Sequence, residues 1–238
     1  LILVIILFSC EELEEQTTPL SGIFYVFEGW NEFMNKDYER AKELFSATLL
    51  ADQNSETNYY DYAYAGLGWT AIYKANINPG IENRILRENL RSEAINHFNS
   101  AELGIQIRLD SSNMNQLDSL LYANIIAGKI FNTSYLAIDK AMEFYSDGSD
   151  DLVWLDALNY SQLVISESDL LLEVFSDYNF EYDESINIED IRIVRAQSFI
   201  RLGDFASAVN EIEFINSLDC NLSQISIIEC LHSSSLKP

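Results

Sequence analysis

The chain has 238 residues and a formal net charge of −24, because 38 aspartates and glutamates outnumber 14 lysines and arginines. So acidic a surface repels nucleic acid and anionic lipid headgroups, which excludes binding through phosphate contacts and favours cationic partners or divalent ions. Hydrophobic residues make up 48%, enough for a sizeable core, whereas 9 glycines and 3 prolines are too few for an all-β fold built on turns.

Residues 1–8 are an unbroken apolar run that ends at Ser9 and Cys10, and an acidic stretch follows at once. The run is shorter than the roughly 20 apolar residues that cross a bilayer. It resembles the end of a bacterial lipoprotein signal peptide, whose lipobox ends in the cysteine that carries the lipid. The resemblance implies a lipidated Cys10 and an outer-membrane lipoprotein of the cell envelope, facing the periplasm or the cell surface. We expect residues 1–9 to be a remnant of the signal peptide and residues 10–21 a flexible lipidated tether; the alternative is a fragment of an ordinary hydrophobic helix.

Two further cysteines, Cys220 and Cys230, lie in a Ser-rich tail that we expect to span residues 217–238. In an oxidising compartment such a pair favours a disulfide, and two free thiols are the alternative. We expect no metal there, since no other cysteine or histidine lies at ligand spacing.

A pattern of small and aromatic residues recurs near the two ends of the chain. Gly29 and Ala41 stand twelve positions apart across a turn, with Phe45 following at helical spacing, and Ala196 and Ala208 repeat the same separation. This resembles the tetratricopeptide repeat, in which two antiparallel helices pack where small residues let them approach. The resemblance implies an all-α fold, a solenoid of helical hairpins that bury one another's apolar faces.

The middle of the chain fits the same pattern more loosely. Gly68 and Phe98 define a second unit, interrupted by the turn signal at residues 78–80. A third unit has Gly128 in a first helix that runs on to a turn at residues 146–149, and Ser161 stands where the family has an aromatic residue. We therefore expect about four irregular repeats.

We place these repeats in one helical domain over residues 22–216. One stretch in it breaks the helical period, because polar and aromatic residues alternate over residues 176–183, which is strand spacing. We expect one short extended connector near 172–183, laid on the solenoid. Asn187 and Asp190 then resemble a capping box that opens the last repeat.

In tetratricopeptide proteins the first helices line a concave groove that holds extended peptides. The resemblance places twelve residues there, with an aromatic end and a polar, partly basic end: Val26, Trp30, Phe33, Met34, Tyr62, Trp69, Ile72, Tyr73, Lys129, Asn132, Gln197 and Arg201. The alternative is that the aromatic residues seal the helices against inserted loops and belong to the core.

Signals for catalysis or cofactors are weak. Residues 66–71 match a relaxed dinucleotide fingerprint but lack the preceding strand that such a site needs. His97 and His232 have no arranged partners. The acidic residues around residues 147–151 and 177–183 lack the full calcium-loop signature, so solvated loops are favoured over ion sites. We predict no cofactor, no metal and no catalytic residues.

Three functions remain as hypotheses. The first is a non-enzymatic, lipid-anchored scaffold that binds an envelope protein or peptide through the groove. The second is a lipoprotein that captures a nutrient, a glycan or a peptide, beside an outer-membrane transporter, as similar tetratricopeptide-containing lipoproteins do. The third is a hydrolase with an acidic site, which the lack of a convergent motif disfavours.

Overall fold

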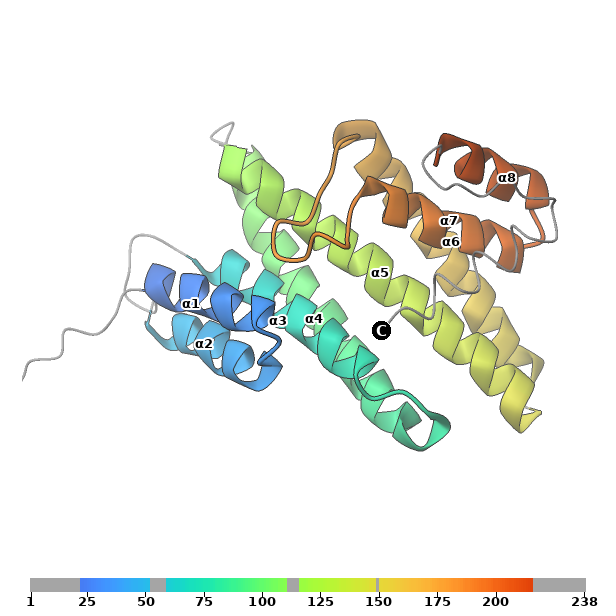
Figure 1. Cartoon of the computed structure of the whole chain (residues 1–238), viewed down its shortest axis with the longest axis horizontal. Helices are drawn as coiled ribbons and strands as arrows, with labels where there is room; N and C mark the ends of the chain where they lie inside the picture. The colour runs from blue at the N-terminus through green and yellow to red at the C-terminus, as the bar shows by residue number, and fades with distance from the viewer. Residues whose placement is uncertain (1–21, 52–58, 111–115, 149, 216–238) are drawn as a thin grey trace, which may run out of the picture.

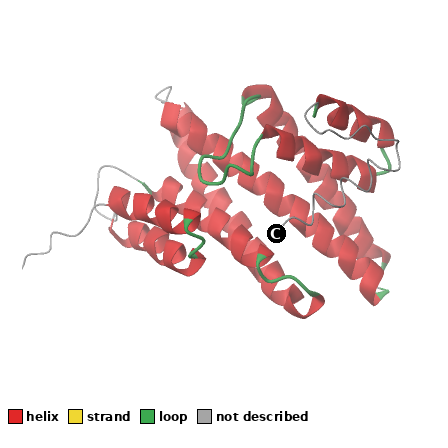
Figure 2. Ribbon diagram, in the orientation of Figure 1, coloured by secondary structure: helices red, strands yellow, loops and turns green. Residues whose placement is uncertain are grey.

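The computed structural model describes residues 22–51, 59–110, 116–148 and 150–215, which fold as helices joined by turns and one longer connection. Figure 2 shows helices and loops but no strand in this part of the chain. The prediction of an all-α fold is therefore confirmed. The expected signal remnant, the tether and the cysteine-containing tail lie outside these ranges.

Eight α-helices and one 3₁₀ turn follow one another along the described residues. They are α1 (Gly22–Met34), α2 (Tyr38–Ala51), α3 (Tyr60–Asn76), η2 (Ile81–Asn83), α4 (Arg84–Asp110), α5 (Gln116–Asp147), α6 (Asp151–Val174), α7 (Ile188–Arg201) and α8 (Phe205–Phe214). Each α-helix packs on the next, and contacts also join α1 to α3, α3 to α5 and α5 to α7. The described helices thus form four consecutive hairpins set side by side (Figure 1).

Local turn signals set several helix ends as predicted. Helix α3 ends at Asn76, and the chain turns through Gly80, whose φ of 98° lies in the left-handed region that suits glycine. Helix α5 runs to Asp147, where Gly148 takes a φ of 59°. The capping box is also confirmed: Asn187 accepts a hydrogen bond from the Glu189 N–H at 2.7 Å and donates its own N–H to Asp190 at 3.0 Å.

Glycines let the first two hairpins approach closely. Phe45 of α2 is fully buried between Gly29 of α1 and Gly66 of α3. A Cβ atom at Gly29 would lie 2.6 Å from the Phe45 ring, and one at Gly66 would lie 2.4 Å from it. The ring therefore fits only because both neighbours lack a side chain.

The same arrangement recurs one hairpin further along the chain. Phe98 of α4 is fully buried between Gly68 of α3 and Gly128 of α5, whose added Cβ atoms would lie 2.7 and 2.2 Å from its ring. In the third hairpin a small residue, Ser161 of α6, stands at the matching place. It is buried and accepts a hydrogen bond from the Arg201 guanidinium of α7 at 2.9 Å.

The connector between α6 and α7 differs in extent from the prediction. Helix α6 continues through Val174, because Leu171 still packs fully buried in the helical period, so the connection covers residues 175–187 rather than 172–183. We refer to residues 175–187 as the connecting segment.

Burial along the connecting segment alternates, as its sequence predicts. Tyr178 and Phe180 are buried, whereas Asp177, Asn179 and Glu181 are exposed. One isolated antiparallel bridge pairs Asn179 with the end of the same segment. The segment therefore folds back on itself, and its buried side chains must pack on helices rather than on a sheet.

Candidate functional site

The connecting segment covers the face of α1, α3 and α5 where the sequence predicted an open groove; we name this face the first-helix surface. Phe180 is fully buried and stacks on Trp69 of α3, with ring centroids 4.2 Å apart. Tyr182 stacks on Trp30 of α1 at 3.8 Å with the rings nearly parallel. The segment thus lays alternate aromatic side chains across two helices, as an extended peptide ligand would.

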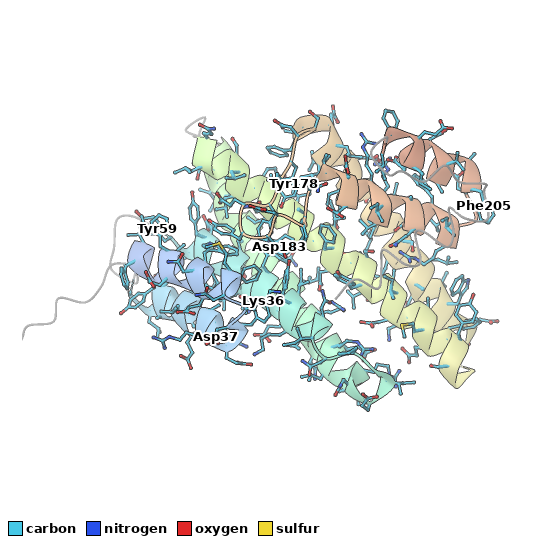
Figure 3. All side chains as sticks on the ribbon, in the orientation of Figure 1. Lys36, Asp37, Tyr59, Tyr178, Asp183 and Phe205 are labelled. Carbon is cyan, nitrogen blue, oxygen red and sulfur yellow. The ribbon has the colours of Figure 1, made fainter. Side chains whose placement is uncertain are left out.

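Side-chain hydrogen bonds attach the connecting segment to the helices on both sides of Phe180. The Tyr178 hydroxyl donates to Asn124 Oδ1 of α5 at 3.1 Å, while Trp69 Nε1 donates to the Asn124 carbonyl at 3.1 Å. Nearer α7, the Tyr73 hydroxyl donates to Asp183. Figure 3 shows Tyr178 and Asp183 on the segment, where it crosses in front of the central helices. These bonds satisfy polar groups that the aromatic packing buries.

Burial and hydrogen bonding shift the pKa values of this pair. Burial raises the pKa of Tyr73, and its hydrogen bond to Asp183 raises it further. Burial alone would raise the pKa of Asp183, but hydrogen bonds from Ser185 and Tyr73, together with the charge of nearby Lys36, hold that pKa below its ordinary value. Asp183 is therefore an ionised anchor for the segment at neutral pH.

The predicted groove residues fall into three groups. Six are buried: Val26, Trp30, Phe33, Trp69, Ile72 and Asn132. Five are half-buried: Tyr62, Tyr73, Lys129, Gln197 and Arg201. Met34 is exposed. The aromatic members do gather, since Phe33 lies 5.3 Å from Trp30 and 4.9 Å from Tyr73 between ring centroids. They belong to the core beneath the connecting segment, so in this structure the first-helix surface is not open to a partner.

The predicted polar end of the groove does not form one lining. Asn132 donates to the Arg91 carbonyl of α4 at 2.9 Å, and Arg201 contacts Ser161 of α6. Burial lowers the pKa of Arg201 to about 10. Lys129 takes part in a different site, described next. The lipidation and disulfide residues Cys10, Cys220 and Cys230 lie outside the part of the chain that the structure describes.

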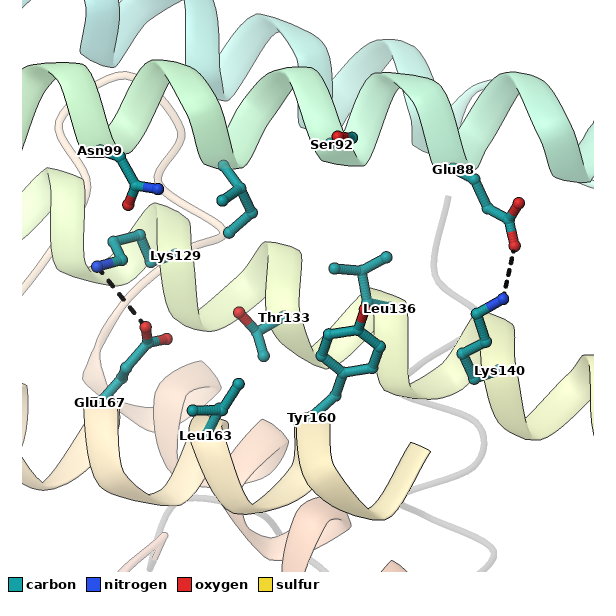
Figure 4. A pocket seen from close by; sticks show the side chains of 11 residues that line it. Glu88, Ser92, Asn99, Lys129, Thr133, Leu136, Lys140, Tyr160, Leu163 and Glu167 are labelled. Atoms are coloured by element: carbon teal, nitrogen blue, oxygen red, sulfur yellow. Dashed lines mark hydrogen bonds and ion pairs between the residues drawn. The ribbon is translucent and has the colours of Figure 1, made fainter. Parts of the chain in front are cut away.

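An open cleft of about 480 Å³ lies on α5 between α4 and α6. We name it the α4–α6 cleft (Figure 4). Its middle is apolar, with Ile95, Leu136 and Leu163 contributed by the three helices, and the Tyr160 ring and the Thr133 hydroxyl stand beside them. Its volume lies within the range of about 300–1,000 Å³ that ligand pockets have, but the cleft is a half-open surface groove rather than an enclosed cavity.

Lysine–glutamate pairs mark the two ends of the α4–α6 cleft. At one end Lys140 Nζ lies 2.9 Å from a Glu88 oxygen and 2.8 Å from a Glu143 oxygen. At the other end Lys129 Nζ lies 3.0 Å from Glu102 and 3.8 Å from Glu167. Figure 4 shows one pair at each end, with the apolar and hydroxyl side chains between them.

Glu167 is the least well compensated of these groups. Its Oε2 atom is shielded from solvent and has no hydrogen-bond partner among the described residues. Burial raises the pKa of this carboxyl, while Lys129 opposes the shift. A buried carboxylate oxygen without a hydrogen-bond donor costs free energy, so ionised Glu167 lowers the stability of the folded chain.

In comparisons with known proteins, no family model, no curated protein and no solved structure matches this chain.

Within the described residues, no three or more histidine, cysteine, aspartate and glutamate side chains come together as a metal site. His97 packs against Tyr64 and lies 3.5 Å from Glu93, and burial lowers its pKa. Asp150 caps α6 by accepting from the Leu152 N–H at 3.4 Å. None of the described helices is long and apolar enough to cross a bilayer.

The sequence contains a signal for the α4–α6 cleft that the repeat pattern obscured. Glu88 and Asn99 on α4 are eleven positions apart, as are Lys129 and Lys140 on α5. Eleven residues make about three turns, so each pair lies on one helix face. Polar residues in register on neighbouring helices indicate a shared polar stripe. The apolar positions between them have the same pattern as core residues, so the sequence alone does not distinguish a cleft from a packed core.

Proposed function

We propose that this protein is a non-enzymatic scaffold built of tetratricopeptide-like hairpins, which binds a protein partner in the bacterial envelope. The repeat assignment is supported by the two phenylalanines, Phe45 and Phe98, that each sit between glycines of successive first helices. It is also supported by the contacts that join α1, α3, α5 and α7 in series. The third hairpin departs from the pattern at Ser161, whose hydroxyl accepts a hydrogen bond from Arg201 of the next hairpin.

The observation that carries the binding role is the α4–α6 cleft. The first-helix surface already holds an extended segment, and it is the chain's own, with Phe180 fully buried against Trp69. Displacing it would expose that aromatic core to water. The α4–α6 cleft is open, and its apolar middle is flanked by charged groups, as in a partner site with a polar rim.

The membrane tether in this proposal rests on Cys10 and the apolar run before it. Diacylglyceryl and acyl chains on one cysteine hold a protein stably at a membrane, because two or more chains are enough. We expect labelled palmitate to be incorporated into the protein and lost in Cys10→Ala. Incorporation that persists in that variant contradicts the tether.

A second candidate is capture of a nutrient, a glycan or a peptide, beside an outer-membrane transporter. It is favoured by the Tyr160 ring in the α4–α6 cleft, whose lining also includes the Ser92 and Thr133 hydroxyls and the Asn99 amide, groups that suit a sugar. A small sugar bound at this cleft, and displaced by Tyr160→Ala, would support capture over a protein partner.

The scaffold is tested by a photo-crosslinking residue placed at Leu163, which lines the α4–α6 cleft and is 49% exposed. A matched probe goes at Glu173, which is exposed on the same helix and is not part of the cleft lining. In the native envelope we expect one discrete protein adduct from position 163 and none from position 173. Equal adducts from both positions, or none from either, would contradict a partner in the cleft.

A further inference from the structure

The charges at the two ends of the α4–α6 cleft are not alike. At the Lys140 end, Glu88 and Glu143 are matched by two bases, because Arg84 also pairs with Glu143. At the other end Glu102 and Glu167 share the single ammonium group of Lys129. The second end therefore carries an excess negative charge.

The excess resides on Glu167. Lys129 Nζ lies 0.8 Å nearer to Glu102 (3.0 Å) than to Glu167 (3.8 Å). Glu167 Oε2 accepts no hydrogen bond within the described part of the chain. An ionised carboxylate accepts up to about four hydrogen bonds, and its terminal torsion turns easily, so this group retains capacity for another donor.

The space beside Glu167 suits an aliphatic chain. Leu163 precedes Glu167 by one helical turn on α6 and is 49% exposed where it faces the cleft. Ile95 and Leu136 continue the apolar floor. A lysine or arginine side chain buries its aliphatic stem on such a floor while its charged head reaches a carboxylate.

We propose that the α4–α6 cleft binds an extended peptide segment that places a lysine or arginine side chain against Glu167 and an apolar side chain over Leu163. The assignment rests on the proposed partner-binding function and names the partner's chemistry. The cleft runs from Lys129 to Lys140, about 16 Å along α5, which matches about five residues of extended chain. The net charge of −24 draws a basic segment toward the protein from a distance.

The test uses the purified full chain and a fluorescent seven-residue peptide of alternating lysine and leucine, followed by anisotropy. Glu167→Gln removes the charge and keeps the shape, whereas Glu173→Gln removes an exposed charge from the same helix. Because both variants change the net charge equally, they lose long-range attraction equally. We expect Glu167→Gln to weaken binding about tenfold and Glu173→Gln less than about twofold.

Two further variants at the same site should change the affinity for the peptide in opposite directions. Leu163→Lys places an ammonium group one turn before Glu167, where it competes with the peptide, so binding is weakened about tenfold. Lys129→Gln removes the resident competitor and strengthens binding. Equal weakening by Glu167→Gln and Glu173→Gln, or no strengthening by Lys129→Gln, would overturn the proposal, since binding would then follow net charge alone.

Thermal unfolding separates a binding defect from a folding defect. The folded-state pKa of Glu167 is raised, so the ionised carboxyl destabilises the folded chain at neutral pH. This penalty begins to shrink as pH falls through the folded-state pKa and is gone below the lower pKa that the group has in the unfolded chain. We therefore expect Glu167→Gln to melt no lower than the natural chain at pH 7. A variant that melts well below it overturns the assignment of Glu167 as a binding group and makes it a structural one.

The two proposals fail in distinguishable ways. If the crosslink from Leu163 forms but the lysine–leucine peptide does not bind, the basic segment is wrong and the scaffold stands. If the peptide binds with the expected variant pattern but no envelope protein is crosslinked, the cleft is a basic-peptide site and the scaffold role is wrong.

Discussion

Tyr73 joins two parts of the chain that lie 110 positions apart, because its hydroxyl donates to Asp183 on the connecting segment. Asp183 also accepts from the Ser185 N–H at 2.9 Å. These bonds to the ionised form hold its pKa below the ordinary value. An acid with a lowered folded-state pKa contributes stability above its unfolded pKa, near 3.9, and loses it as pH falls through the folded-state pKa.

We expect Tyr73→Phe to lower the free energy of unfolding by about 0.5–1 kcal/mol at pH 7, since Asp183 is only partly shielded from water. The cost should be smaller well below pH 3.8, once the pH has fallen through the lowered pKa of Asp183 and protonation has removed the charged acceptor. Urea unfolding at pH 7 and at such a low pH measures both costs. Tyr145→Phe, at a side chain 75% exposed, is the control and should change neither value. An equal cost at both pH values would show that the hydroxyl does not act through the Asp183 carboxylate.

At the scale of elements, the connecting segment behaves as part of the core. We expect Phe180→Ala to destabilise the chain by about 3–5 kcal/mol, because a fully buried ring leaves a cavity beside Trp69 and Trp30. Phe205→Ala, at a ring 59% exposed on α8, should cost less than about 0.5 kcal/mol. Chemical denaturation compares them, and a cost near that of the control would mean that the segment is held loosely.

A second prediction at this scale concerns the close packing of helices α2 and α3, where Gly66 lies against the Phe45 ring. Gly66→Ala gains about 1 kcal/mol of helix propensity but pushes a methyl group into the Phe45 ring, 2.4 Å away. Because that ring is fully buried and Gly29 backs its other side, overpacking outweighs the gain and we expect a net loss of about 1–2 kcal/mol. Phe45→Leu in the same chain should recover part of it in a double-mutant cycle. Additive losses would show that the glycine and the ring do not interact.

Signals that act over a few residues were sufficient to predict much of the fold. The turn before Gly80, the end of α5 at Asp147 and the capping box at Asn187 all depend on near neighbours, so the sequence alone predicts them. The alternation of buried and exposed residues in the connecting segment was likewise predictable from its period of two.

The position at which the connecting segment packs could not be predicted from the sequence. The stack of Phe180 on Trp69 and of Tyr182 on Trp30 joins positions more than a hundred residues apart, and no local pattern specifies such a pairing. The aromatic residues on α1 and α3 were therefore compatible both with an open groove and with a core. The α4–α6 cleft escaped prediction for a related reason, since Glu167 becomes distinctive only once three helices enclose it.

For the molecule as a whole, the excess of acidic residues opposes compaction. The net charge of the 38 acids and 14 bases is repulsive. Many of the ion pairs that oppose this repulsion join neighbouring helices near the surface, such as partly exposed Lys42 of α2 with Glu93 of α4 at 2.5 Å. Surface pairs of this kind contribute little to stability and are screened by salt. The long-range repulsion is screened as well, because the Debye length falls from about 30 Å at 0.01 M to about 3 Å at 1 M.

We therefore expect salt to stabilise the protein, because the screened repulsion exceeds the screened attractions when the net charge is −24. Raising NaCl from 20 mM to 500 mM should increase the melting temperature by about 3 °C, which corresponds to about 1 kcal/mol for a domain of this size. A neutral osmolyte at equal osmolality separates charge screening from general effects of solute. A melting temperature that falls with salt would instead mean that the lysine–glutamate pairs between the helices, those of the α4–α6 cleft included, stabilise the fold more than the overall repulsion destabilises it.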